Sequence, residues 1–156
     1  MPRKYQHMQL MLPQIKEMLQ QGMTQKEIEK VCRKYGFQKV SCPSLADISL
    51  FETSGHAMKF NDELFRVESP KGHKYVLKPV QCPHHTQIYA SKLRSYRDLP
   101  IRYMESDKQY RAELQGAVSG LSRVYAITIE DGHSFCTREQ VKQLIEKCKE
   151  GINEEK

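Results

Sequence analysis

The chain has 156 residues, of which 38% are hydrophobic and 28% charged, with a mean hydropathy of −0.69. This composition fits one folded domain with at most a small appendage, and no apolar run approaches the roughly 18 residues of a membrane span, so membrane proteins are excluded. The net charge of +6 suits a polyanionic partner such as RNA, DNA or nucleotide phosphates. Five irregularly spaced cysteines without a C-x-x-C pair, and no apolar leader, predict a reducing, cytoplasmic setting.

The N-terminal residues 1–29 predict a helical hairpin. Thr24 followed by Glu27 is the signature of a capping box, so the second helix is expected to begin at about Gln25 and to end at Gly36. Two helices joined by a short turn have the shape of a helix-turn-helix that binds DNA. Two amphipathic helices that pack on each other give the same pattern, so the sequence leaves both interpretations open.

Beyond Gly36 the apolar pattern predicts short strands and helices. In chain order we expect a strand at 37–40, a helix at 45–51, two strands at 63–68 and 73–78 around a Pro-Gly turn, a helix at 84–93, two strands at 101–111 and 123–129 with a mobile loop between them, and a last helix that opens at Thr137. Because these strands do not alternate with helices, the pattern favours an α+β fold with antiparallel strands.

The end of the expected strand 101–111 carries Arg111 and, two residues further on, Glu113. A guanidinium is a planar, permanently charged fork that suits a phosphate or a carboxylate. A carboxylate on the same face can accept a hydrogen bond from an amino group. The chain has no Walker loop and no G-x-G-x-x-G motif, so side chains would have to bind any phosphate. A surface salt bridge is the alternative interpretation of the same residues.

Cys82 and His133 carry a thiol and an imidazole, which are both good zinc ligands. They lie 51 residues apart, so only the fold can bring them together. His84 and His85 add two imidazoles beside the cysteine, and Asp131 can anchor an amine, a hydroxyl or a metal-bound histidine. The alternatives are a buried thiol, a hydrogen-bonded histidine and a solvated acidic turn.

Five strings, in this order, resemble the catalytic domain of threonyl-tRNA synthetases, which are class II aminoacyl-tRNA synthetases. The resemblance runs from about Lys30 to Lys149. The first string is similar to motif 1 of the class, with Pro43 at the motif's proline, and the Cys-Pro-x-His and His-x-Phe-Cys-Thr elements are typical of the threonyl enzymes. The strings are KYGFQKVSCPSL, LFETSGHAMKF, LKPVQCPHHTQIY, LRSYRDLPIRYMES and QYRAELQGAVSGLSRVYAITIEDGHSFCTREQ.

The resemblance implies the fold and the partners. Residues 30–150 would form a partial class II synthetase domain, an antiparallel sheet flanked by helices with motifs 1 and 2, between the hairpin 1–29 and a tail at 151–156. The partners implied are ATP-Mg²⁺, threonine and tRNA, together with a second copy of the chain bound through the motif 1 region. The DNA expected from a helix-turn-helix would bind the N-terminal helices.

The resemblance also assigns roles to single residues. Arg111 matches the motif 2 arginine that holds the ATP α-phosphate and the amino-acid carboxylate, and Glu113 matches the glutamate near the adenine amino group. Arg123 matches the arginine that opens the second motif 2 strand. Two further matches concern threonine: Cys82 and His133 correspond to two of the three protein ligands of the catalytic zinc, and Asp131 corresponds to the aspartate that receives the threonine hydroxyl.

Departures from the family pattern set the expected activity. The third zinc ligand and motif 3 follow, in the family, beyond the last helix expected here, so we expect an incomplete zinc site and a truncated catalytic fragment that does not complete threonine–tRNA ligation alone. His84 replaces a glycine, Ile127 replaces the aromatic residue that stacks on adenine, and Phe51 and Ala57 replace two tryptophans. The alternatives are a nucleic-acid-binding or regulatory module that dimerises through the synthetase remnant, and a recombined reading frame without selected activity.

Overall fold

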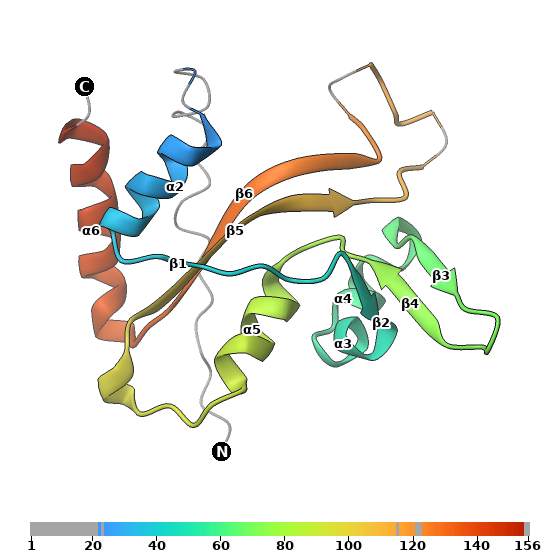
Figure 1. Ribbon diagram of the computed structural model, residues 1–156, viewed down its shortest axis with the longest axis horizontal. Coiled ribbons are helices and arrows are strands. Elements are labelled where there is room, and N and C mark those ends of the chain that lie inside the picture. Colours follow the sequence, from blue (N-terminus) through green and yellow to red (C-terminus); the bar gives the residue numbers. More distant parts are fainter. Residues whose placement is uncertain (1–21, 23, 115, 121–122, 155–156) are drawn as a thin grey trace. The chain divides into compact units, whose positions relative to one another are not determined.

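The structure, a computed structural model, describes residues 22, 24–114, 116–120 and 123–154 (Figure 1). These residues divide into two compact units. Unit 1 holds the described residues of Met1–Val40, Ala90–Glu105 and Glu130–Lys156, and unit 2 holds those of Ser41–Tyr89 and Ser106–Ile129. The first helix of the predicted N-terminal hairpin lies outside the described residues.

Unit 1 begins with helix α2 (Gln25–Lys34), whose predicted limits are confirmed. The backbone N–H and the hydroxyl of Thr24 both donate to Glu27 Oε2 at 2.7 Å, so the capping box forms. The helix ends before Gly36, which has a φ of +80° and therefore a backbone conformation that side chains with a Cβ rarely adopt. Ile28 and Cys32 are fully buried and belong to one apolar cluster with Phe37 and Met104.

One sheet has the strand order β1-β5-β6 (Figure 1). Strand β1 (Gln38–Lys39) pairs with β5 (Ile101–Tyr110) in parallel, with Gln38 opposite Tyr103. The expectation of antiparallel strands is therefore wrong for this pair. More than sixty residues separate the two strands, and a connection of that length allows parallel pairing, whereas a tight hairpin does not.

Strand β6 (Ala126–Phe135) extends further than the strand predicted at 123–129. Its second half contains two carboxylates, a glycine and a histidine, residue types that seldom indicate a strand, yet every residue from Glu130 to Phe135 is buried. Burial and pairing with β5 thus override the local preference.

The last element, helix α6 (Arg138–Glu154), follows Thr137 as predicted and runs on into the residues expected to form a tail. The Thr137 N–H donates to Gln140 Oε1 at 3.0 Å and the Gln140 N–H donates to Thr137 Oγ1 at 3.4 Å, so the two side chains cap the first turn. None of the described helices is long and apolar enough to cross a bilayer.

Unit 2 contains an antiparallel sheet with the strand order β2-β4-β3. The predicted hairpin is confirmed with narrower limits, β3 (Arg66–Glu68) and β4 (Lys74–Leu77). The helix expected at 45–51 is wrong at its start, because β2 (Leu45–Asp47) is a strand and only then does α3 (Ile48–Thr53) begin. Asp47 accepts a hydrogen bond from the Ser49 N–H at 2.9 Å, so it caps the helix rather than continuing it.

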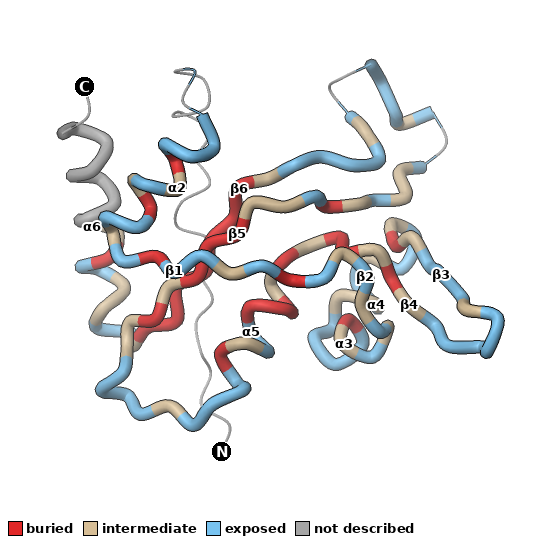
Figure 2. Tube along the Cα trace, in the orientation of Figure 1, coloured by how far each residue is buried: buried red, intermediate tan, exposed pale blue. Residues whose placement is uncertain are grey.

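The short elements of unit 2 enclose a small core. Helix α4 (His56–Lys59) and the 3₁₀ helix η1 (Asn61–Glu63) follow α3. Helix α5 (Cys82–Ala90) begins and ends earlier than the helix predicted at 84–93. In unit 1, a second 3₁₀ helix, η2 (Tyr96–Asp98), precedes β5. Phe51, Leu64 and Val76 form the buried cluster. Figure 2 shows burial on α5 and along β5 and β6.

Phe51 is the largest apolar side chain of this cluster and has no exposed surface. We expect Phe51→Ala to lower the free energy of unfolding by about 3–5 kcal/mol, because the substitution leaves a cavity between α3, Leu64 and Val76. Urea denaturation followed by circular dichroism measures the loss. The control is Met58→Ala on α4, where the side chain is 87% exposed and the expected change stays within about 0.5 kcal/mol. Equal effects of the two substitutions would contradict this packing.

Glu29 joins α2 to β1, since Lys39 Nζ lies 2.6 Å from Glu29 Oε2 and Arg33 Nη2 lies 2.7 Å from Oε1. These hydrogen bonds, first that from Lys39, lower the pKa of Glu29 from its ordinary 4.5. A lowered carboxyl pKa stabilises the fold above the ordinary value, and this contribution is lost as pH falls through the folded-state pKa.

We therefore expect Lys39→Met to raise the pKa of Glu29 towards 4.5, as measured by NMR titration of the side-chain carboxyl group. Lys34→Met is the control, because Lys34 lies on the same helix and makes no such bond with Glu29. The same pKa in all three proteins would mean that Lys39 does not hold Glu29 in solution.

Candidate functional site

Arg111 stands directly after β5, at the end of the ribbon that β5 forms with β6. Its backbone N–H donates to the carbonyl of Tyr125 at 2.9 Å, and the N–H of Ala112 donates to the carbonyl of Glu63 at 2.8 Å. The backbone at this point of unit 2 is thus held from two sides. The Arg111 side chain is exposed, and within the described ranges no hydrogen bond or ion pair occupies its guanidinium. It can accept a ligand without first losing a partner.

Glu113 and Arg123 meet across the loop at the same end of the ribbon. Arg123 Nε donates to Glu113 Oε2 at 2.8 Å, and Arg123 Nη2 lies 2.6 Å from the same oxygen. The Glu113 side chain is 8% exposed and that of Arg123 is 57% exposed. The hydrogen bond that Arg123 donates to Glu113 raises the pKa of Arg123, so this guanidinium keeps its charge. The salt bridge expected as an alternative for this segment therefore involves Glu113 with Arg123, not with Arg111.

Asp131 and His133 lie on β6 in unit 1, two residues apart and therefore on one face of the strand. Both are buried, with side-chain exposures of 5% and 1%, and His133 Nε2 lies 3.9 Å from Asp131 Oδ2. The other oxygen, Oδ1, accepts a hydrogen bond from the Gly132 N–H at 2.9 Å. The carboxylate is thus fixed on one side by the backbone and faces the imidazole on the other.

Cys82 is the first residue of α5 in unit 2 and is partly buried. Thr86 Oγ1 donates to its carbonyl at 2.9 Å. A thiol and an imidazole are suitable donors for Zn²⁺, so the residue types fit the metal that the sequence implies. Cys82 and His133 belong to different units. Their pairing at one metal therefore stays a prediction.

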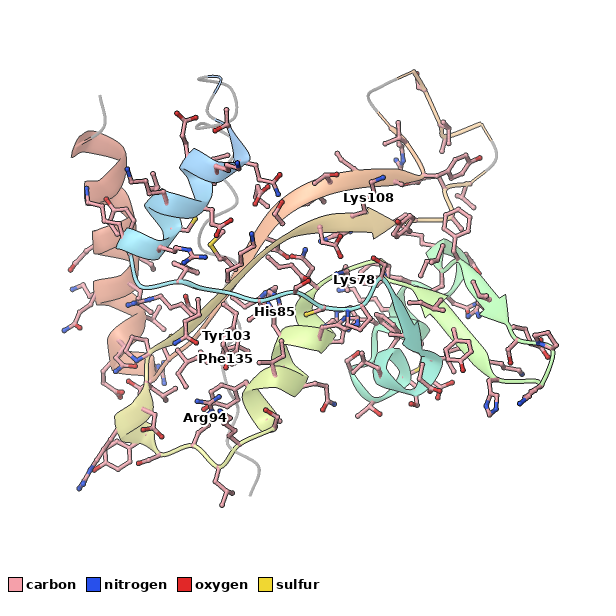
Figure 3. The ribbon with its side chains drawn as sticks, viewed as in Figure 1. Lys78, His85, Arg94, Tyr103, Lys108 and Phe135 are labelled. Atoms are coloured by element: carbon pink, nitrogen blue, oxygen red, sulfur yellow. The ribbon has the colours of Figure 1, made fainter. Side chains whose placement is uncertain are left out.

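The sequence reasoning missed a second ion pair in unit 2, in which Lys78 (labelled in Figure 3) pairs with Asp107. Lys78 Nζ lies 2.6 Å from Asp107 Oδ2, and the lysine side chain has no exposed surface. A lysine at the end of an alternating strand ordinarily indicates a solvated position. The only hint in the sequence is that Lys78 stands between the apolar run of β4 and the buried Pro79.

Comparisons with known proteins agree with this fold. The model of the tRNA synthetase class II core domain (G, H, P, S and T) matches residues 65–154. A threonine–tRNA ligase of Stenotrophomonas maltophilia is 46% identical over 118 residues, which are 76% of this chain and 18% of the relative. A threonine–tRNA ligase of Streptococcus pyogenes is 40% identical over 134 residues, 85% of this chain and 20% of the relative. The chain thus spans about a fifth of the length of these relatives.

Solved structures give the same result. The RNA binding domain of threonyl-tRNA synthetase from Cryptosporidium parvum Iowa II is similar with a TM-score of 0.73 and 32% identity, over 79% of this chain and 30% of that one. Giardia lamblia prolyl-tRNA synthetase in complex with prolyl-adenylate is similar with a TM-score of 0.67 and 25% identity, over 80% and 27% of the two chains.

These matches confirm the predicted α+β fold of class II synthetases and the similarity to threonyl-tRNA synthetases. They lend no support to the alternative of a DNA-binding or regulatory module. With more than half of its length matched by the family model, the chain belongs to the class II aminoacyl-tRNA synthetase core-domain family.

Proposed function

We propose that this chain provides the part of a threonine–tRNA ligase that binds ATP and threonine. The observation that carries the proposal is the end of the β5–β6 ribbon, where the exposed guanidinium of Arg111 stands beside the Glu113–Arg123 ion pair. Relatives 40–46% identical to the chain are threonine–tRNA ligases, which supports this choice of amino acid. Complete ligation by this chain alone is not part of the proposal, and the homodimer through the motif 1 region stays a prediction.

In this proposal, Arg111 binds the α-phosphate of ATP and the carboxylate of threonine. The carboxylate oxygen attacks the α-phosphorus, the bond to pyrophosphate breaks, and threonyl-adenylate forms. A 3′-terminal hydroxyl of tRNA then attacks the threonyl carbonyl, and AMP leaves. The guanidinium neutralises negative charge on two reactants and holds them in line, so its contribution is positioning and electrostatic stabilisation. Arg123 holds Glu113 in place, and the second oxygen of that carboxylate accepts from the adenine amino group.

The threonine side chain is proposed to be recognised by residues of β6. Asp131 accepts a hydrogen bond from the threonine hydroxyl, and a site built around that hydroxyl rejects valine because valine has no hydroxyl to donate. Cys82 and His133 would hold Zn²⁺, which supplies Lewis-acid coordination of the amino and hydroxyl groups of threonine. Asp131 Oδ2 lies 3.9 Å from His133 Nε2, close enough to restrict the orientation of the imidazole.

Isothermal titration with ATP-Mg²⁺ tests the role of Arg111. We expect the native chain to bind ATP and Arg111→Ala to bind it about tenfold or more weakly, because a charged hydrogen bond to phosphate is lost. Lys71→Ala is the matched control, since it removes an exposed cation of unit 2 in the turn between β3 and β4. No heat with the native chain would refute ATP binding, and equal affinities of the two variants would refute the role of Arg111.

Zinc content and threonine affinity test the second half of the proposal. We expect Cys82→Ser and His133→Ala to lose bound zinc, and Asp131→Asn to retain zinc but bind threonine more weakly, because its amide is a poorer acceptor for the hydroxyl. Atomic absorption and titration with threonine and valine measure these effects. The controls are Cys136→Ser and Glu146→Gln. Native protein that holds no zinc, or that binds valine as well as threonine, would contradict this assignment.

A further inference from the structure

We infer that Lys78 is a positioning residue, which fixes the turn that leads to Cys82 against strand β5, whose last residue directly precedes Arg111. All the groups involved lie in unit 2. The part of the inference that concerns ligand binding rests on the proposed function. The part that concerns the backbone does not.

The side chain of Lys78 is buried completely, which is unusual for a lysine unless the ammonium group is paired. Nζ donates to Asp107 Oδ2 at 2.6 Å and to the carbonyl of Cys42 at 3.4 Å. Ser44 Oγ donates to the same carboxylate oxygen at 3.4 Å. One ammonium group therefore joins the end of β4, the segment before β2 and strand β5.

The backbone of Lys78 is tied to the same two segments. Its N–H donates to the carbonyl of Ser44 at 2.8 Å, and its carbonyl accepts from the N–H of Tyr110 at 2.9 Å. Tyr110 is the last residue of β5 and directly precedes Arg111. Side chain and backbone of one residue thus fix both the register of β5 and the approach of the segment before β2.

Only three residues separate Lys78 from Cys82, and they form a constrained link. Pro79 is buried and its ring fixes one backbone dihedral angle. Gln81 is fully buried, and its carbonyl accepts from the His85 N–H at 3.1 Å, at the start of α5. A shift of Lys78 is therefore passed to the first residue of α5 and, through Tyr110, to Arg111.

A role in positioning predicts more than a role in stability. An apolar side chain of similar length fills the same space without the cost of burying a charge, so a buried ion pair is weak evidence for stabilisation. Such a side chain cannot direct Asp107 and the Cys42 carbonyl at the same time. Removing both charges therefore separates the two roles: stability returns, but the alignment of Tyr110 and Cys82 does not.

The experiment compares Lys78→Met, Asp107→Asn and the double variant with native protein. Lys108→Met is the matched control, because Lys108 is an exposed lysine on the same strand, one residue after Asp107 (Figure 3). Four quantities are measured: the urea midpoint of unfolding, hydrogen exchange of the Tyr110 amide, the Kd for ATP-Mg²⁺, and the Co²⁺ absorption spectrum. The Co²⁺ absorption spectrum reports the thiolate of Cys82.

We expect Lys78→Met to lower the urea midpoint and the double variant to regain most of it. In the double variant the Tyr110 amide still exchanges faster than in native protein, the Co²⁺ spectrum is altered, and ATP binds about 10- to 100-fold more weakly, which is the range for groups that orient ligating residues. The Lys108→Met control leaves all four measurements unchanged.

Recovery of Tyr110 protection and of ATP affinity together with the urea midpoint would show a structural role only and overturn the inference. If the double variant does not fold, the same quantities are measured on Asp107→Asn alone. Native values of Tyr110 exchange and ATP affinity in that variant would equally overturn the inference. Native protein that binds no ATP refutes the proposed function, whereas the Tyr110 exchange rates still decide whether Lys78 aligns the strand.

Discussion

Two ion pairs, each with one buried partner and one more exposed partner, constrain unit 2 at the places where chemistry is expected. In the first, Lys78 has no exposed surface and Asp107 is 29% exposed; in the second, Glu113 is 8% exposed and Arg123 is 57% exposed. Such pairs contribute modestly to stability, but loss of one partner leaves a poorly solvated charge, which is costly. They therefore act mainly as geometric constraints. Lys78 fixes the strand before Arg111, and Arg123 fixes the carboxylate after it.

Two departures from the family pattern meet in the fold. The resemblance implies a tryptophan at Phe51 and a glycine at His84. In the structure the two rings pack edge to face, with centroids 5.9 Å apart and an angle of 66° between their planes. Phe51 belongs to the buried core of unit 2, and His84 is itself buried. The side chain of His84, which stands where the family pattern has a glycine, thus packs against Phe51.

Local rules predicted those elements whose ends are set by local hydrogen bonds. The Thr24–Glu27 capping box placed the start of α2, and Thr137 placed the start of α6. The same rules fail where contacts beyond the local sequence decide the structure. They predict Asp47 inside a helix, whereas Asp47 caps helix α3, and they do not predict that β1 pairs in parallel with a strand distant in sequence. Among the site residues, side-chain chemistry alone offered Arg111, Glu113, Cys82, Asp131 and His133, and the resemblance added Arg123 and assigned the roles. The pairing of Glu113 with Arg123 and the burial of Lys78 depend on contacts between residues distant in sequence, which the spacing of residues along the chain does not predict.

The most direct test is an NMR titration of the native chain with ATP-Mg²⁺, in which backbone and guanidinium resonances at the end of the β5–β6 ribbon are followed. We predict saturable shifts of the Arg111, Glu113 and Arg123 resonances, whereas the resonances of the Arg66 guanidinium on β3 stay unchanged. Shifts spread evenly over exposed arginines, or no shift at millimolar ATP, would contradict the claim that the end of this ribbon is a nucleotide site.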